Sequence, residues 1–327
     1  MPQMEHTSTK NPTYSNFYMN RQYSHTRILS LLFIAIFSVS LFSCEKEVSI
    51  NLQSSAAKVV VQGSIETGGV PLVILNSSIG FFSKVDLATL QNSFIHGAIV
   101  TVSDGTKTIK LKEYTFDTST SFKFSVYTVD TTNFSFDNII LGEVNKTYTL
   151  SITYEGQTYT GVTKIPNPQG VDSMWFAEPQ FAGSTTPDSA LQLFVSYSDP
   201  DTLGDYVRYF TQRNNDQEYP SDIFSDEIIN GKKLNSIGLV AGDQNNANAN
   251  VSRDSLIYFF PGETVTLKWN AIDKGVYKFY NSLQFAKNAV GNPFSSPINP
   301  ITNMKNGALG VWAGYGVYSK TMVVPHK

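Results

Sequence analysis

Hydrophobic and polar residues alternate along the first half of the chain. In the segment 147–154, Tyr148, Leu150 and Ile152 share one face while threonine and serine occupy the other. This period of two is typical of a strand that is buried on one face. The same alternation predicts seven short strands, at residues 58–66, 70–78, 97–104, 106–114, 122–129, 145–154 and 157–165. Such a series of short strands predicts an immunoglobulin-like β-sandwich over residues 58–165.

Two dipeptides mark the turns between these strands. Asp104-Gly105 and Glu155-Gly156 each stand between two alternating segments. Glycine accepts the positive φ that a two-residue hairpin loop requires. Both dipeptides therefore predict tight β-hairpins.

The alternation stops at residues 165–170, where Pro166 and Pro168 cannot serve a central strand. We place a domain boundary there, with a second, β-rich domain over residues 171–327. Its predicted strands cover residues 171–178, 191–198, 206–212, 256–260, 264–270 and 317–324.

Three further segments of the second half have a different pattern. The polar stretch 214–253 predicts a long loop. Apolar residues at helical spacing after Asp273, a good N-cap residue, predict a helix near residues 274–288. The proline-, asparagine- and glycine-rich stretch 292–316 predicts ordered loops.

Residues 1–43 have the organisation of a signal peptide. An apolar run of 15 residues, 28–42, follows Arg21 and Arg27, which is shorter than the roughly 20 residues of a membrane span. Translation starting at Met19 instead of Met1 would give a leader of ordinary length.

Cys44 is the only cysteine and follows the apolar run directly. The stretch from Leu41 to Cys44 resembles a bacterial lipobox, which implies a cysteine acylated with fatty acids such as palmitate. Several acyl chains anchor a protein stably to a membrane. The alternative is an incidental cysteine behind an ordinary signal peptide. Residues 44–57 then form the lipidated tether, and their acidic start resembles an export signal of Bacteroidetes lipoproteins, although a solvated tether would look similar.

Composition and charge narrow the class of protein. Hydrophobic residues make up 41% of the chain and charged residues 16%, which suits a β-rich folded protein. Without the leader the formal net charge is about −5, because Lys10, Arg21, Arg27 and Glu5 leave the totals. An acidic chain without basic runs gives no footprint for nucleic acid.

The sequence contains no recognisable catalytic motif. Only His96 and His326 lie outside the leader, so a histidine-based metal or acid–base centre is not expected. Asp199, Asp201 and Asp205 are the best candidate for a cation site, because closely spaced carboxylates can bind calcium. The same residues are also ordinary turn formers. We otherwise expect no cofactor.

Aromatic residues in the glycine-rich region are the candidates for binding a ligand or partner. They are Trp312, Tyr315 and Phe294, and exposed aromatic side chains concentrate in binding hot spots. The alternative, which we favour, is that Trp312 and Tyr315 pack in the core beside glycines that permit close approach.

Several landmarks in order resemble the domain of unknown function family 4249, a group of Bacteroidetes lipoproteins. They include Cys44, the strand Val59-Val60-Val61-Gln62-Gly63, the exit Ile165-Pro166, Ser198-Asp199-Pro200 with Tyr206 and Arg208 after it, and the segment from Gly307 to Gly316. The resemblance spans the mature chain. It implies a surface lipoprotein, often encoded beside TonB-dependent outer-membrane receptors.

These observations favour a non-enzymatic binding or accessory module. It would be lipid-anchored in the outer membrane, face the cell surface, and act in nutrient uptake with a TonB-dependent receptor. Two alternatives stay open. One is a carboxylate-based surface hydrolase, for which a pair of carboxylates about 5–10 Å apart across a pocket would be the sign. The other is a structural or adhesive component of the envelope.

Overall fold

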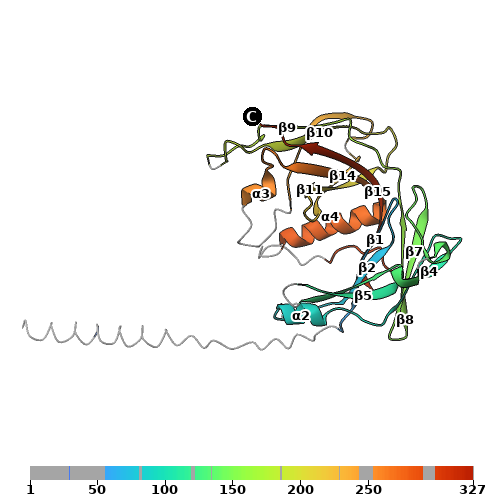
Figure 1. The fold of residues 1–327 in the computed structure, drawn as a ribbon. Helices are drawn as coiled ribbons and strands as arrows, with labels where there is room; N and C mark the ends of the chain where they lie inside the picture. Colours follow the sequence, from blue (N-terminus) through green and yellow to red (C-terminus); the bar gives the residue numbers. More distant parts are fainter. Residues whose placement is uncertain are drawn as a thin grey trace, which may run out of the picture. The chain divides into compact units, whose positions relative to one another are not determined.

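The predicted alternation is realised as strands, and the fold is mostly β (Figure 1). The structure, a computed structural model, describes residues 29, 56–80, 83–118, 122–133, 135–184, 186–227, 229–242, 253–289 and 299–326. Residues Ser55–Lys327 form one compact unit. Its short helices are α2 (Leu87–Asn92), η1 (Thr131–Asn133), η2 (Phe136–Asn138) and α3 (Arg253–Ile257).

The strands of the first half form two layers of a sandwich. Their order is β1-β2-β6-β5 in one layer and β4-β3-β7-β8 in the other. Taken as strands A to G in chain order, with a C′ strand, this is the arrangement of an immunoglobulin domain, so the predicted sandwich is confirmed. Buried side chains of both layers meet in one core. The strands are β1 (Val59–Glu66), β2 (Leu72–Ser77), β3 (Ile99–Ser103), β4 (Thr108–Lys110), β5 (Lys112–Asp117), β6 (Lys123–Thr128), β7 (Thr147–Tyr154) and β8 (Gln157–Lys164).

The segment 106–114, predicted as one strand, crosses between the layers. It divides at Leu111 into β4 and β5, which belong to different layers. The N–H of Leu111 donates to the carbonyl of Val100 at 2.8 Å, so the backbone stays hydrogen-bonded at the crossing. Alternation could not show this, because it reports which face is buried and not which strand is the neighbour.

The two hairpins differ in their loops. Glu155 and Gly156 connect β7 to β8 with φ of 49° and 77°, as a two-residue loop of type I′ requires. Between β3 and β4 the positive φ falls on Gly105, while Asp104 N–H donates to the carbonyl of Lys107 at 3.1 Å. Asp104 and Lys107 therefore close the hairpin, and the loop consists of residues 105 and 106. It lies one residue later than the predicted loop Asp104-Gly105.

Tyr148 forms the tyrosine corner that is typical of this architecture. Its side chain is fully buried in β7. The hydroxyl donates to the carbonyl of Leu141 at 3.0 Å and accepts from the N–H of Glu143 at 2.7 Å. This pair of hydrogen bonds fixes the connection that enters β7.

A single long strand, β15 (Leu309–Val323), connects the sandwich to the second half. Its first part pairs in parallel with β1, and its second part pairs antiparallel with β14 (Thr264–Ile272). One eight-stranded sheet, of order β12-β11-β14-β15-β1-β2-β6-β5, therefore extends through both halves. That residues 165–170 separate two domains stays a prediction. The eight-stranded sheet contains strands from both halves of the chain.

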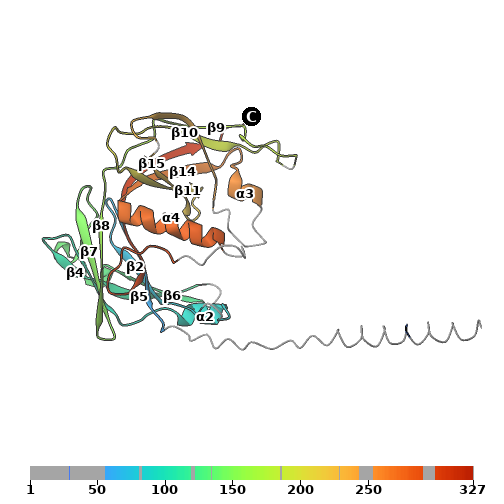
Figure 2. The ribbon, with the colours of Figure 1, turned by 180° about the vertical axis from the view of Figure 1, so that it is seen from behind.

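The second half builds a layer on each face of this sheet. On one face, buried residues of the sheet pack with the three-stranded sheet β13-β10-β9. On the other face lies the helix α4 (Lys274–Ala289), which contacts β11, β12 and β15 (Figure 2). The remaining strands are β9 (Ser173–Ala177), β10 (Gln192–Ser198), β11 (Tyr206–Arg213), β12 (Tyr219–Ser225) and β13 (Lys233–Leu239).

The helix predicted near 274–288 is confirmed, together with its cap. Asp273 Oδ1 accepts from the N–H of Val276 at 2.9 Å, as an N-cap residue does. Its other oxygen accepts from Thr163 Oγ1 at 2.5 Å and Lys164 N at 2.9 Å. One carboxylate thus caps α4 and connects the helix to β8 of the sandwich.

Three predictions in the second half are wrong. Residues 256–260 are not a strand, since helix α3 extends to Ile257. The prediction failed because a short apolar run does not distinguish a helix from a strand. The supposed loop 214–253 contains β12 and β13. The supposed loops at 292–316 include the first half of β15. Residues 243–252 and 290–298 lie outside the described part.

Candidate ligand-binding pocket

Alternation along β11 places one charged side chain among aromatic ones beneath α4. Tyr206, Arg208 and Phe210 project to the same face of the sheet, because side chains two residues apart share a face. Tyr206 stacks on Tyr277 of α4, with ring centroids 4.5 Å apart. This stacking places α4 over the face of β11 that carries Arg208.

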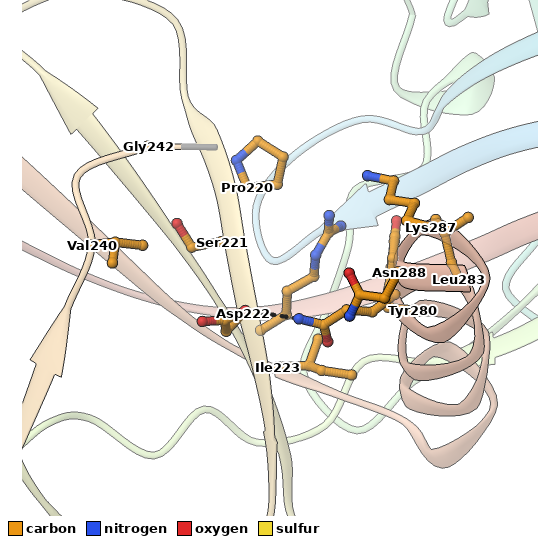
Figure 3. Close-up of a pocket in the computed structure, with 12 residues that line it drawn as sticks. Pro220, Ser221, Asp222, Ile223, Val240, Gly242, Tyr280, Leu283, Lys287 and Asn288 are labelled. Carbon is orange, nitrogen blue, oxygen red and sulfur yellow. Dashed lines mark hydrogen bonds between the residues drawn. The ribbon is translucent and has the colours of Figure 1, made fainter. Parts of the chain in front are cut away.

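A pocket of about 330 Å³ opens between β12 and the second half of α4. Lys287 and Asn288 extend from the helix on one side, and Pro220, Ser221 and Asp222 lie on the strand opposite (Figure 3). β12 is the edge strand of the eight-stranded sheet. The pocket therefore lies at an open margin of the sheet.

A β-bulge shapes the strand wall of the pocket. Arg208 pairs with Ile223 and Phe210 with Pro220, so two residues of β12 oppose the single residue Tyr209. Bulges redirect side chains that would otherwise alternate between faces. Consequently four consecutive residues, 220–223, all line the pocket.

Arg208 lines the pocket without a carboxylate partner among the described residues. Its Nη1 donates to the hydroxyl of Tyr315 at 2.9 Å. The guanidinium carbon lies 3.5 Å from the ring centroid of Tyr280 and 4.8 Å from that of Phe210. Its Nε is buried and has no hydrogen-bond partner in the part of the chain described. Stacking on aromatic rings stabilises the cation in part.

The tyrosines around Arg208 form a buried polar network. The hydroxyls of Tyr280 and Tyr315 lie 3.1 Å apart. Burial raises the pKa of Tyr315 well above its usual range, so the hydroxyl stays neutral. Burial alone would lower the pKa of Arg208, but Tyr315 and Tyr280 outweigh it and the net shift is upward. The guanidinium is therefore a permanent cation.

A second buried polar group lies across from Arg208. Asn270 of β14 is its partner in the antiparallel register and is completely buried. Neither its amide nitrogen nor its amide oxygen has a hydrogen-bond partner in the described residues. Buried polar groups are nearly always paired. The sheet face beneath α4 thus holds more hydrogen-bonding capacity than its own residues use.

The helix wall carries a second cation. Residues 3, 4, 7 and 8 positions after Tyr280 lie on its side of a helix. They are Leu283, Gln284, Lys287 and Asn288, and all line the pocket. Gln284 Nε2 donates to Asp222 Oδ1 at 3.1 Å across the pocket. Among the described residues that line the pocket, Arg208 and Lys287 therefore face one carboxylate, Asp222, which is already hydrogen-bonded.

The aspartates proposed for calcium are used in turns. Asp199 Oδ2 accepts from the N–H of Gly231 at 3.2 Å, and Asp205 Oδ2 accepts from Thr202 Oγ1 at 3.0 Å, while Asp201 is exposed. Burial, together with the nearby carboxylates of Asp226 and Asp205, raises the pKa of Asp199. No group of three or more His, Cys, Asp or Glu that could hold a metal ion occurs among the described residues.

The other predicted site residues have different places. Trp312 is fully buried in the sandwich core, and its indole Nε1–H donates to the carbonyl of Tyr148 at 3.0 Å. Tyr315 supports the pocket through Arg208 without lining it. Cys44 and Phe294 lie outside the described residues.

Arg208 and Lys287 were not predicted from the sequence as site residues. A signal for Arg208 was present: it is a charged residue on the same strand face as Tyr206 and Phe210, where an apolar residue is expected. Lys287 carries no such signal, because a lysine on an exposed helix position is ordinary.

A second pocket, of about 550 Å³, lies on the sandwich and is lined by two carboxylates, Glu113 and Asp130. Although burial opposes it, hydrogen bonds from Gly97 N–H, His96 and Tyr127 lower the pKa of Glu113. Hydrogen bonds from Thr132 and Lys112 lower the pKa of Asp130. Both carboxylates are thus held ionised, whereas a glycosidase needs one of its pair protonated.

Together these features define a class of protein: an immunoglobulin-like sandwich that shares a sheet with a second β layer, with a polar pocket beneath one helix. Residues 45–321 match the model of the family described as Domain of unknown function (DUF4249). The chain belongs to this family. No curated protein matches it.

Proposed function

We propose that this protein is a lipid-anchored, non-enzymatic binding module of the bacterial outer membrane. It faces the cell surface and acts with a TonB-dependent receptor in nutrient uptake. The observation that carries the binding role is the pocket between β12 and α4, where Arg208 lies without a carboxylate partner among the described residues. Concave pockets with a few fixed polar groups are the usual form of small-molecule sites.

The anchor is inferred from the sequence around Cys44. No helix in the described part of the chain is long and apolar enough to cross a membrane. A cysteine bearing acyl chains would attach the folded unit to the membrane through the tether 44–57, and leave the pocket in the aqueous phase.

Replacing Cys44 by serine is expected to abolish lipid attachment, because serine offers no sulfur to acylate. Cells fed with labelled palmitate should label the wild-type chain and not Cys44→Ser. Fractionation should recover less of the variant than of the wild type in the outer membrane. A variant that keeps both the label and the membrane fraction would contradict the anchor.

The partner is tested by affinity purification from gently solubilised outer membranes. A TonB-dependent receptor is expected to co-purify with the wild-type chain in stoichiometric amount. It should be depleted with Cys44→Ser, since an unanchored chain is not confined beside the receptor. Recovery of the wild-type protein alone would refute the transporter role.

A further inference from the structure

We propose that the pocket between β12 and α4 binds the oxyanion group of a small organic acid or ester, a carboxylate or phosphate, on Arg208 and Lys287. This inference rests on the proposed binding function and names the chemical class of its ligand. It follows from the charge, the hydrogen-bond donors and the size of the pocket.

The charge of Arg208 favours an anionic ligand. The neighbouring Arg213, on the same strand, is paired with Glu263 at 2.8 Å. Arg208 has no such ion pair with any described residue, although it is also partly buried. Keeping an unneutralised cation out of water is costly. An anion entering the pocket would supply the missing counter-charge.

The geometry of the guanidinium also favours an oxyanion. One nitrogen is held by Tyr315, and Tyr280 lies against the group. The remaining N–H groups are therefore oriented in advance. A planar fork of donors matches carboxylate and phosphate oxygens, to which arginine bonds in pairs.

The helix wall of the pocket adds further hydrogen-bond donors. Gln284, Lys287 and Asn288 add an ammonium and two amides on the same side of α4 as Tyr280. The opposing carboxylate, Asp222, already accepts a hydrogen bond from Gln284. The balance of charge in the pocket is thus positive.

The size of the pocket limits the ligand. A volume of about 330 Å³ is at the low end for small-molecule sites, which are roughly 300–1,000 Å³. A metabolite of modest size fits this space, and a folded protein domain does not.

The test is isothermal titration calorimetry on the full-length chain in mild detergent, with citrate, inorganic phosphate and neutral glucose as probes. At least one oxyanion should bind with a Kd of about 1 mM or tighter. The affinity should fall as NaCl is added, because salt screens the attraction. Glucose should give no heat. Heat with citrate alone would indicate a carboxylate site, and heat with phosphate alone would indicate a phosphate site.

Two variants assign the binding to the pocket. Lys287→Gln should weaken oxyanion binding about threefold, the effect of one exposed charge. Arg208→Lys should weaken it about tenfold or more, because lysine cannot form the paired hydrogen bonds. The control Lys278→Gln removes a charge from an exposed position of α4 that does not line the pocket, and its affinity should equal that of the wild type. Circular dichroism checks that Arg208→Lys is folded, and Lys287→Gln leaves the buried network intact.

The inference fails if no oxyanion binds, or if binding is the same in both pocket variants as in the wild type. Glucose binding that Arg208→Lys leaves unchanged would overturn the oxyanion site and leave the proposed binding function standing. If no receptor co-purifies with the wild-type chain, by contrast, the result would count against the proposed function and not against the oxyanion site.

Discussion

Trp312→Ala is expected to lower the free energy of unfolding by about 3–5 kcal/mol, the range for removing a large aromatic side chain from a core. The indole is completely buried and donates its N–H to the carbonyl of Tyr148. It also packs tightly over the backbone of β1, since a Cβ added at Gly63 would lie 2.7 Å from its ring. The substitution removes a hydrogen bond and leaves a large cavity.

Urea denaturation followed by circular dichroism measures this loss. A single transition is expected, because β15 carries Trp312 into the sandwich core and continues as a neighbour of β14. Trp175→Ala is the matched control, because Trp175 is only partly buried and stacks on Phe194; its cost should be about 1–2 kcal/mol. A loss below that of the control, or two separate transitions, would contradict the role given to β15.

Gly310→Ala is expected to destabilise the protein by about 3 kcal/mol, through two separate costs. Gly310 has a φ of 97°, which an L side chain rarely adopts. A Cβ there would also overlap the carbonyl oxygen of Val61, its neighbour in the parallel pairing of β15 with β1. The backbone would have to separate at the point where the two halves share a sheet.

Gly307→Ala separates these costs. Gly307 has a similar φ of 89°, but nothing lies within 4 Å of an added Cβ. It should therefore cost only about 1 kcal/mol, the conformational part alone. Equal losses of thermal stability in the two variants would show that the close approach of β15 to β1 does not matter.

The elements that the sequence predicts well depend on local pattern. The sandwich strands follow from an alternation that burial on one face imposes, and the Glu155-Gly156 turn follows from the φ values of its own residues. Helix α4 follows from its periodicity and from Asp273, whose capping bond reaches only three residues along the chain. Each signal lies within the segment that it describes.

The errors occur where a distant neighbour decides the structure. The first part of β15 resembles a loop because it is rich in glycine, yet its glycines permit contact with other backbones. A Cβ at Gly314 would lie 2.8 Å from the carbonyl oxygen of Lys164. Strand β12 resembles a polar loop because, as an edge strand, it buries few side chains.

By itself, the sequence determined the mostly β class, the immunoglobulin-like half and the capped helix, because periodicity and turn chemistry are properties of short segments. Only the tertiary structure decided that β15 joins both halves, and that Arg208 meets Tyr280 and Lys287 from a helix some seventy residues away along the chain. A pocket built from a strand edge and a helix depends on register and packing between distant segments, and these have no local signature.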